Sequence, residues 1–183
     1  MIKLLGVAGS LRSGSFCRAV MATITGLALP NTTIAQFDLS GMPLFNDDLD
    51  GPTQPTPVAA MRQAIACADG LVLISPEYNH GMSGVMKNAL DWASRPTSQA
   101  VLKEKPVLVM TVSPAITGGV RAHQQLNETL LATQSRLVAG RQIVIGQAHE
   151  KIVDGSLVDL PTLDFITKRI QDLMRVCTGS GSA

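Results

Sequence analysis

Short apolar runs alternate along the chain with segments whose apolar residues recur every three or four positions. The runs predict β-strands at residues 2–8, 32–37, 70–74, 106–112 and 141–145. The segments with the longer period predict helices that begin after residues 15, 56, 82, 117 and 159. In the run Gly70-Leu71-Val72-Leu73-Ile74 every residue is apolar, which is typical of a strand buried on both faces of a sheet.

Alternation of five strands with five helices, without internal repeats, predicts a doubly wound parallel sheet. Five strands in 183 residues favour the flavodoxin-like strand order over the six-stranded Rossmann order. The predicted fold class is therefore α/β, a flavodoxin-like three-layer α/β/α sandwich with a five-stranded parallel sheet. We expect one domain over residues 1–178 and a flexible tail at 179–183. The proline-rich residues 40–57 predict a long loop, with Thr56 capping the next helix.

Composition narrows the class of protein. Hydrophobic residues make up 45% of the chain and charged residues 16%, which fits a folded globular protein. The formal net charge is +1, so there is no electrostatic footprint for nucleic acid or for an anionic membrane, and we expect neither as a partner. The three cysteines are widely spaced, and no run resembles a signal peptide or approaches the ~20 apolar residues of a membrane span. These features predict a cytoplasmic protein.

The loop after the first predicted strand has the composition of an anion site. Its sequence is Gly-Ser-Leu-Arg-Ser-Gly-Ser-Phe at residues 9–16. Backbone amides, the serine hydroxyls, the guanidinium of Arg12 and the following helix N-terminus would all favour a phosphate. Neither a Walker A motif nor a Gly-x-Gly-x-x-Gly fingerprint is present. The alternative is a hydrophilic turn with an ordinary capping serine.

Two further loops follow predicted strands and would lie at the same edge of the sheet. After residue 74 the chain reads Ser-Pro-Glu-Tyr-Asn-His-Gly, which contains the only tyrosine of the chain. Tyr78 could stack on a flat ligand, Asn79 could donate and accept hydrogen bonds, and amides after Glu77 could donate to ring carbonyls. The loop at 113–119 again supplies hydroxyls and glycines. Ordinary βα turns are the alternative, with the single tryptophan, Trp92, as a core residue.

These motifs strongly resemble the NADPH-dependent FMN reductase family. The resemblance rests on the loop at 9–16, on Pro-Glu-Tyr-Asn at 76–79 with Gly-Val-Met-Lys-Asn-Ala-Leu-Asp-Trp-Ala-Ser at 84–94, and on Pro-Leu-Phe-Asn-Asp-Asp-Leu at 43–49. It implies that the FMN phosphate is surrounded by Ser10, Arg12, Ser15 and Phe16, that the isoalloxazine is lined by Pro76, Glu77, Tyr78 and Asn79, and that Ser113 approaches it from the next loop. Cys17 stands where the family usually has Asn, which puts one phosphate contact in doubt. Ser83 stands where it usually has Pro, and we expect it to loosen the loop beside the flavin.

The resemblance also implies an activity. The protein would be an FMN-dependent NAD(P)H:acceptor oxidoreductase, with hydride passing from NADPH or NADH to flavin N5 and then to the acceptor by a ping-pong mechanism. The small-molecule acceptors would be quinones, chromate, ferric chelates, azo compounds or free flavin, and the assembly a homodimer or homotetramer. The alternative is a flavodoxin-like electron carrier without direct NAD(P)H oxidation. Such carriers are usually strongly acidic, whereas this chain is near neutral.

No catalytic side chain is certain, because the cofactor carries the redox chemistry. Arg95 could meet an anionic acceptor, or could simply be a cation at a helix end. His80 could donate a proton to a reduced quinone, or could be a solvated loop residue. No cluster of His and Cys has the spacing of a metal site, so no bound metal is expected.

Overall fold

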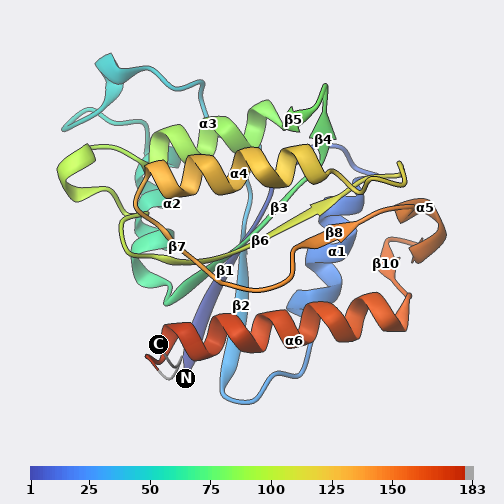
Figure 1. Ribbon diagram of the computed structural model, residues 1–183. Coiled ribbons are helices and arrows are strands. Elements are labelled where there is room, and N and C mark those ends of the chain that lie inside the picture. Colours follow the sequence, from blue (N-terminus) through green and yellow to red (C-terminus); the bar gives the residue numbers. More distant parts are fainter. Residues whose placement is uncertain (180–183) are drawn as a thin grey trace.

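A parallel sheet runs through the middle of the molecule, and helices cover both of its faces (Figure 1). The computed structural model describes residues 1–179, so all but the first residue of the predicted tail lies outside the described range. The strands of the sheet are β1 (Ile2–Ala8), β2 (Thr32–Phe37), β3 (Gly70–Ser75), β6 (Pro106–Val112), β7 (Arg136–Leu137) and β8 (Ile143–Ile145).

The strand order confirms the predicted fold class. It runs β2-β1-β3-β6-β7, with β8 also paired with β6, and every pairing in this sheet is parallel. If β7 and β8 are counted together as the fifth strand of the sheet, this is the flavodoxin-like strand order. Both β3 and β6 are buried at every position, as their unbroken apolar sequences predict.

Helices form two layers over separate cores. The helices α2 (Thr56–Cys67), α3 (Gly84–Ala93) and α4 (Val120–Ala132) pack on one face, and α1 (Phe16–Thr25) and α6 (Leu160–Cys177) pack on the other. Strand side chains alternate between these cores: Leu71 and Leu73 face the first, whereas Val72 and Ile74 face the second. This arrangement leaves the carboxyl ends of β1, β3 and β6 free to carry loops.

The predicted strand at 141–145 is wrong in extent. The fifth position of the sheet is divided, because β7 pairs with the start of β6 and β8 pairs with its end. Between them residues 138–142 leave the sheet. Arg169 of α6 holds this excursion by donating from Nη2 to the carbonyl oxygens of Val138 (3.1 Å) and Ala139 (2.8 Å).

Two helix boundaries also differ from the prediction. Helix α2 begins at Thr56 itself and follows Pro55, whose side chain makes no capping bond, so Thr56 is not the cap. Helix α4 begins at Val120 because Gly118 and Gly119 have φ angles of 61° and 93°, which a right-handed helix excludes. Short elements that the sequence pattern misses are the hairpin β4 (Glu77–Tyr78) with β5 (Gly81–Met82), the helix α5 (Ala148–Lys151), the hairpin β9 (Ile152–Val153) with β10 (Ser156–Leu157), and the 3₁₀ turns η1 (Asp47–Leu49) and η2 (Thr97–Gln99).

The long loop before α2 is fastened to the end of α3. Trp92 is fully buried, which confirms its role in the core, and its indole N–H donates to the Pro43 carbonyl at 2.9 Å. Arg62 of α2 donates to the Trp92 carbonyl from Nε and Nη2, and its Nη1 pairs with Asp50 at 2.7 Å. Two buried side chains therefore keep this loop against the helices.

Within residues 1–179, no helix combines the length and apolar character that crossing a membrane requires. The same residues contain no group of three or more His, Cys, Asp or Glu side chains placed to hold a metal ion.

Candidate functional site

A cavity of about 200 Å³ lies where the loops after β1, β3 and β6 meet. Eight of the nine residues predicted to bind the cofactor line it, namely Ser10, Arg12, Ser15, Phe16, Pro76, Glu77, Tyr78 and Ser113. Cys17, Val112 and Pro114 complete the lining. Residues more than one hundred positions apart in the sequence are thus brought to one place at the carboxyl edge of the sheet.

One end of the cavity is suited to an anion. Ser15 is the N-cap of α1, and its hydroxyl accepts the Arg18 backbone N–H at 3.3 Å. The first turn of α1 contains no acidic residue, so the partial positive charge of the helix N-terminus is not opposed there. Arg12 is exposed and donates from Nη2 to the Gly14 carbonyl at 2.9 Å, which closes the loop around this end. Backbone amides and a guanidinium together favour a phosphate.

Cys17 adds a neutral group at this end. Burial is the main cause that raises the pKa of its thiol to about 12, so the thiol stays protonated at neutral pH. It therefore brings no negative charge that would repel a phosphate.

The other end of the cavity is formed by the β4–β5 hairpin. Asn79 and His80 form its two-residue turn, and their φ angles of 50° and 66° are those of a type I′ turn. Tyr78 is 50% exposed and lines the cavity, so its ring is available to a flat ligand. Asn79 is not among the residues that line the cavity and lies beside it, in the turn of the hairpin.

Glu77 connects this hairpin to α4. One carboxylate oxygen, Oε2, accepts the backbone N–H groups of Arg121 (3.0 Å) and Ala122 (3.1 Å). The N-cap residue of α4 is Gly119, which has no side chain, so Glu77 supplies the capping oxygen from another element. A negative charge at a helix N-terminus is stabilising. Glu77 is thus a structural residue that also borders the cavity.

The two weaker candidates lie outside the cavity. His80 lies in the turn of the hairpin, where its Nδ1 contacts the Arg121 guanidinium. Arg95 follows the C-terminal end of α3, where it pairs with Asp47 at 3.5 Å and lies over the Phe45 ring. Arg95 thus lies at the opposite end of α3 from the hairpin, and the two ends of this 10-residue helix are about 15 Å apart.

Two residues that make hydrogen bonds at or beside the hairpin are not predicted to do so from the sequence. Gln125 of α4 accepts the Met82 backbone N–H with its side-chain oxygen at 2.7 Å, and a helical glutamine gives no local signal of such a contact. Ser83 is 2% exposed and is hydrogen-bonded through both its N–H and its hydroxyl. Ser83 is thus held in place at the start of α3 by its own hydrogen bonds.

Comparison with known proteins identifies the family. The family model for NADPH-dependent FMN reductases matches residues 2–150. The chain belongs to the NADPH-dependent FMN reductase family. Membership confirms the predicted enzyme class, an FMN-dependent NAD(P)H:acceptor oxidoreductase, and it favours this class over the electron carrier.

Relatives of this FMN reductase family member cover nearly its whole length. The NAD(P)H-dependent FMN reductase of Pseudomonas aeruginosa is 37% identical over 173 residues, covering 94% of this chain and 93% of the relative. A 2-hydroxy-1,4-benzoquinone reductase from a Burkholderia species is 40% identical over 166 residues, covering 90% of each. The solved structure of FerB, an NAD(P)H:acceptor oxidoreductase from Paracoccus denitrificans, superposes with a TM-score of 0.87 at 29% identity over the full length of both chains.

Proposed function

We propose that the cavity at the carboxyl edge holds FMN, and that the enzyme reduces quinones with NAD(P)H in two successive half-reactions. The observation that carries the proposal is the convergence of eight predicted residues from three separate loops on one cavity. Bound FMN would supply the redox chemistry, accepting a hydride from the nicotinamide and passing reducing equivalents to the acceptor.

Each wall of the cavity has a distinct task in this proposal. Arg12, the Ser15 hydroxyl and the N-terminus of α1 bind the phosphate. Tyr78 and the amides of the β4–β5 hairpin hold the ring system, and Ser113 approaches it from the loop after β6. A backbone donor near the pyrimidine end would stabilise the negative charge that develops on reduction.

Quinones are the proposed acceptor class because the Burkholderia relative is named as a benzoquinone reductase and matches 90% of this chain. No side chain is assigned as an acid or base, since His80 and Arg95 lie outside the cavity lining. A shelf bordered by the exposed Tyr78 ring suits flat acceptors of several kinds.

We also propose a cytoplasmic homodimer that can associate into a tetramer. Large apolar side chains at Leu44, Ile116 and Leu131 are exposed in the single chain, and association would bury apolar surface of this kind. All three cysteines are free, which fits a reducing compartment. Sedimentation analysis at micromolar concentration tests the assembly, because a species at the 19.3 kDa mass of one chain would contradict it.

Rapid mixing of the FMN-loaded protein with NADH or NADPH tests the activity. We expect direct bleaching of the flavin absorbance, followed by reoxidation when a benzoquinone is added. Parallel lines in double-reciprocal plots at several quinone concentrations would support ping-pong turnover. Flavin that is reduced only in the presence of a separate reductase would contradict the proposal.

A further inference from the structure

The start of α3 connects two loops of the cavity, the phosphate loop (residues 9–16) and the ring loop (residues 75–82). Gly9 lies against this helix so closely that a Cβ atom there would be 2.9 Å from both the Met86 Cβ and the Ser83 Oγ. Real Cβ atoms do not approach other heavy atoms to this distance, so a side chain at Gly9 would push the two loops apart. Their spacing is therefore set by a backbone-to-helix contact.

Two buried hydroxyls fasten this contact. The Ser83 hydroxyl donates to the Gly9 carbonyl at 2.6 Å, and it accepts the Met86 backbone N–H at 3.2 Å. The Ser83 backbone N–H donates to the Ser75 hydroxyl at 3.2 Å, which in turn donates to the Pro76 carbonyl at 2.8 Å. Ser75 is fully buried, so water does not compete for these bonds.

Every bond in this network has a defined direction. Each hydroxyl donates one hydrogen bond and accepts at least one, so neither is left with an unused proton. The network includes the backbone of the phosphate loop at Gly9 and the backbone of the ring loop at Pro76. Ser83 stands between them and contacts both sides.

We propose that Ser83, acting with Ser75, is a positioning residue that fixes the spacing of the phosphate loop and the ring loop and thereby favours FMN over riboflavin. The inference rests on the proposed binding of FMN in this cavity. Neither serine lines the cavity, so both act through the loops they hold.

The argument follows from how a two-ended ligand binds. FMN would occupy both subsites, whereas riboflavin, which has no phosphate, would occupy only the ring subsite. Once the ring is bound, the effective concentration of the phosphate at its own loop depends on the spacing between the two loops being fixed. If that spacing fluctuates, FMN loses part of this advantage and riboflavin loses little. The ratio of FMN affinity to riboflavin affinity therefore measures how firmly the spacing between the two loops is fixed.

The test compares FMN and riboflavin dissociation constants for the apoprotein, measured by quenching of flavin fluorescence. For Ser83→Ala we expect the FMN dissociation constant to rise about tenfold, because the buried hydrogen bond from the Ser83 hydroxyl to the Gly9 carbonyl is lost while the Ser83 backbone N–H still bonds to Ser75. The riboflavin constant should change by less than about twofold, since only the ring subsite is used. Ser83→Thr keeps a hydroxyl and should recover most of the FMN affinity.

Asp159→Ala is the matched control. Asp159 caps α6 by accepting the Thr162 N–H at 2.9 Å, so this variant loses a helix cap of the same kind away from both loops. It should leave the ratio of FMN to riboflavin affinity unchanged. If Ser83→Ala does not fold, Ser75→Ala and Ser83→Gly test the same network, because glycine is tolerated as a helix cap.

The outcomes separate the two proposals. Wild-type protein that does not bind FMN would contradict the proposed function itself. Wild-type protein that binds FMN, with an unchanged affinity ratio in Ser83→Ala, would overturn the role of Ser83 alone. A parallel fall in both affinities would also overturn it, because a general loss of structure would weaken riboflavin as much as FMN.

Discussion

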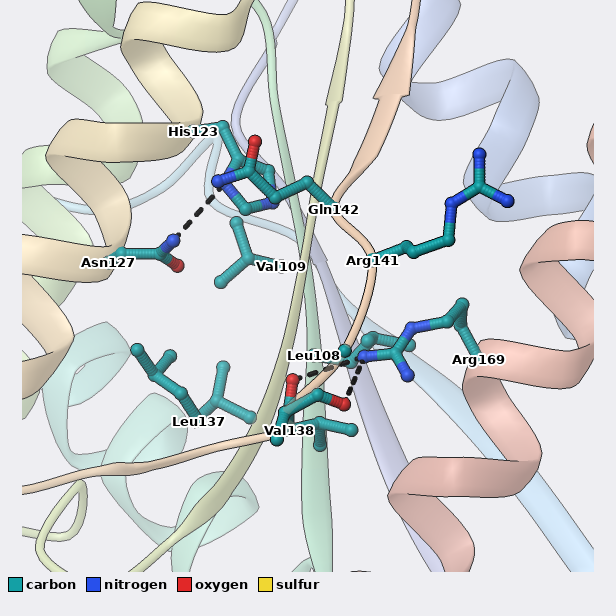
Figure 2. Close-up of a pocket in the computed structure, with 12 residues that line it drawn as sticks. Leu108, Val109, His123, Asn127, Leu137, Val138, Arg141, Gln142 and Arg169 are labelled. Atoms are coloured by element: carbon teal, nitrogen blue, oxygen red, sulfur yellow. Dashed lines mark hydrogen bonds between the residues drawn. The ribbon is translucent and has the colours of Figure 1, made fainter.

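Two cavities of similar size border the same strand, β6, but only one has the character of a ligand site. The cavity of about 200 Å³ at the carboxyl edge includes Val112 at the end of β6 and Ser113 from the loop after it. A second pocket of about 220 Å³, the strand-break pocket, lies where β7 and β8 separate, beside Leu108 and Val109 (Figure 2). Volume alone does not distinguish them.

The difference lies in what their polar groups already bind. In the strand-break pocket Arg169 is 7% exposed, and it donates to the carbonyls of Val138 and Ala139 and pairs with Asp172. His123 is paired through Nδ1 with the Asn127 amide at 3.2 Å, as Figure 2 shows. In the carboxyl-edge cavity Arg12 is exposed and Tyr78 is half exposed. Arg169 and His123 in one pocket are bonded to groups of the fold, whereas Arg12 and Tyr78 in the other are exposed to a ligand.

The largest expected effect is on the strand-break pocket. Arg169→Met should lower the free energy of unfolding by about 3 kcal/mol, because the part-buried hydrogen bonds from the buried Arg169 guanidinium to the Val138 and Ala139 carbonyls, and its pair with Asp172, would be lost. FMN affinity of the folded fraction should stay the same. Urea unfolding and flavin titration measure the two quantities.

Arg175→Met is the control for that experiment. Arg175 also pairs with Asp172, but its side chain is 61% exposed, so its loss should change stability by less than about 1 kcal/mol. A fall in FMN affinity in Arg169→Met would show that the two cavities are not independent.

The second prediction concerns the carboxyl-edge cavity, where we expect a substitution to weaken FMN binding without lowering stability. Arg12→Ala should weaken FMN binding by about 2 kcal/mol, or roughly 30-fold, because a charge-assisted hydrogen bond to the phosphate is lost. The stability of the apoprotein should change little, since Arg12 is exposed and its hydrogen bond goes to Gly14 within its own loop. Arg95→Ala, at the far end of α3, should retain FMN. Equal flavin loss in both variants would contradict the assignment of Arg12.

A third prediction concerns Glu77, which borders the ligand cavity yet serves the fold. Glu77→Ala removes the oxygen that caps α4, so it should lower the stability of the apoprotein by about 1 kcal/mol. Glu77→Gln keeps an acceptor oxygen and should lose less. Thermal unfolding of the two variants measures the difference. Equal stability of wild type and Glu77→Ala would mean that the α4 cap contributes nothing.

The sequence predicts the carboxyl-edge cavity much better than it predicts the break between β7 and β8. Unbroken apolar runs predict β3 and β6, and hydroxyls and glycines placed after strands predict the loops of the ligand cavity. The strand break depends on Arg169, which lies 30 residues after Ala139 in the sequence. Such a contact leaves no local pattern, so residues 141–145 are predicted as one strand.

Gln125 and Ser83, which hydrogen-bond to distant backbone groups, are not predicted for the same reason. Gln125 reaches Met82 across 43 residues, and Ser83 reaches Gly9 across 74. Local periodicity places each of these residues on a helix or at its start, but it does not report which distant backbone group the side chain meets. Residues that line the cavity are therefore easier to predict here than the residues that support its loops.

The smallest expected effect is the pH dependence contributed by His123 in the strand-break pocket. Burial is the main cause that lowers the pKa of its imidazole below the usual 6.5. Below about pH 6.5 the unfolded chain binds a proton at this residue while the folded protein does not, so the free energy of unfolding falls as the pH decreases towards the lowered pKa. His123→Gln should make this part of the stability profile flatter, as measured by urea unfolding between pH 7.5 and 5.5. His149→Gln is the control, because its ring is 57% exposed. A slope that His123→Gln leaves unchanged would show that other groups cause the acid sensitivity.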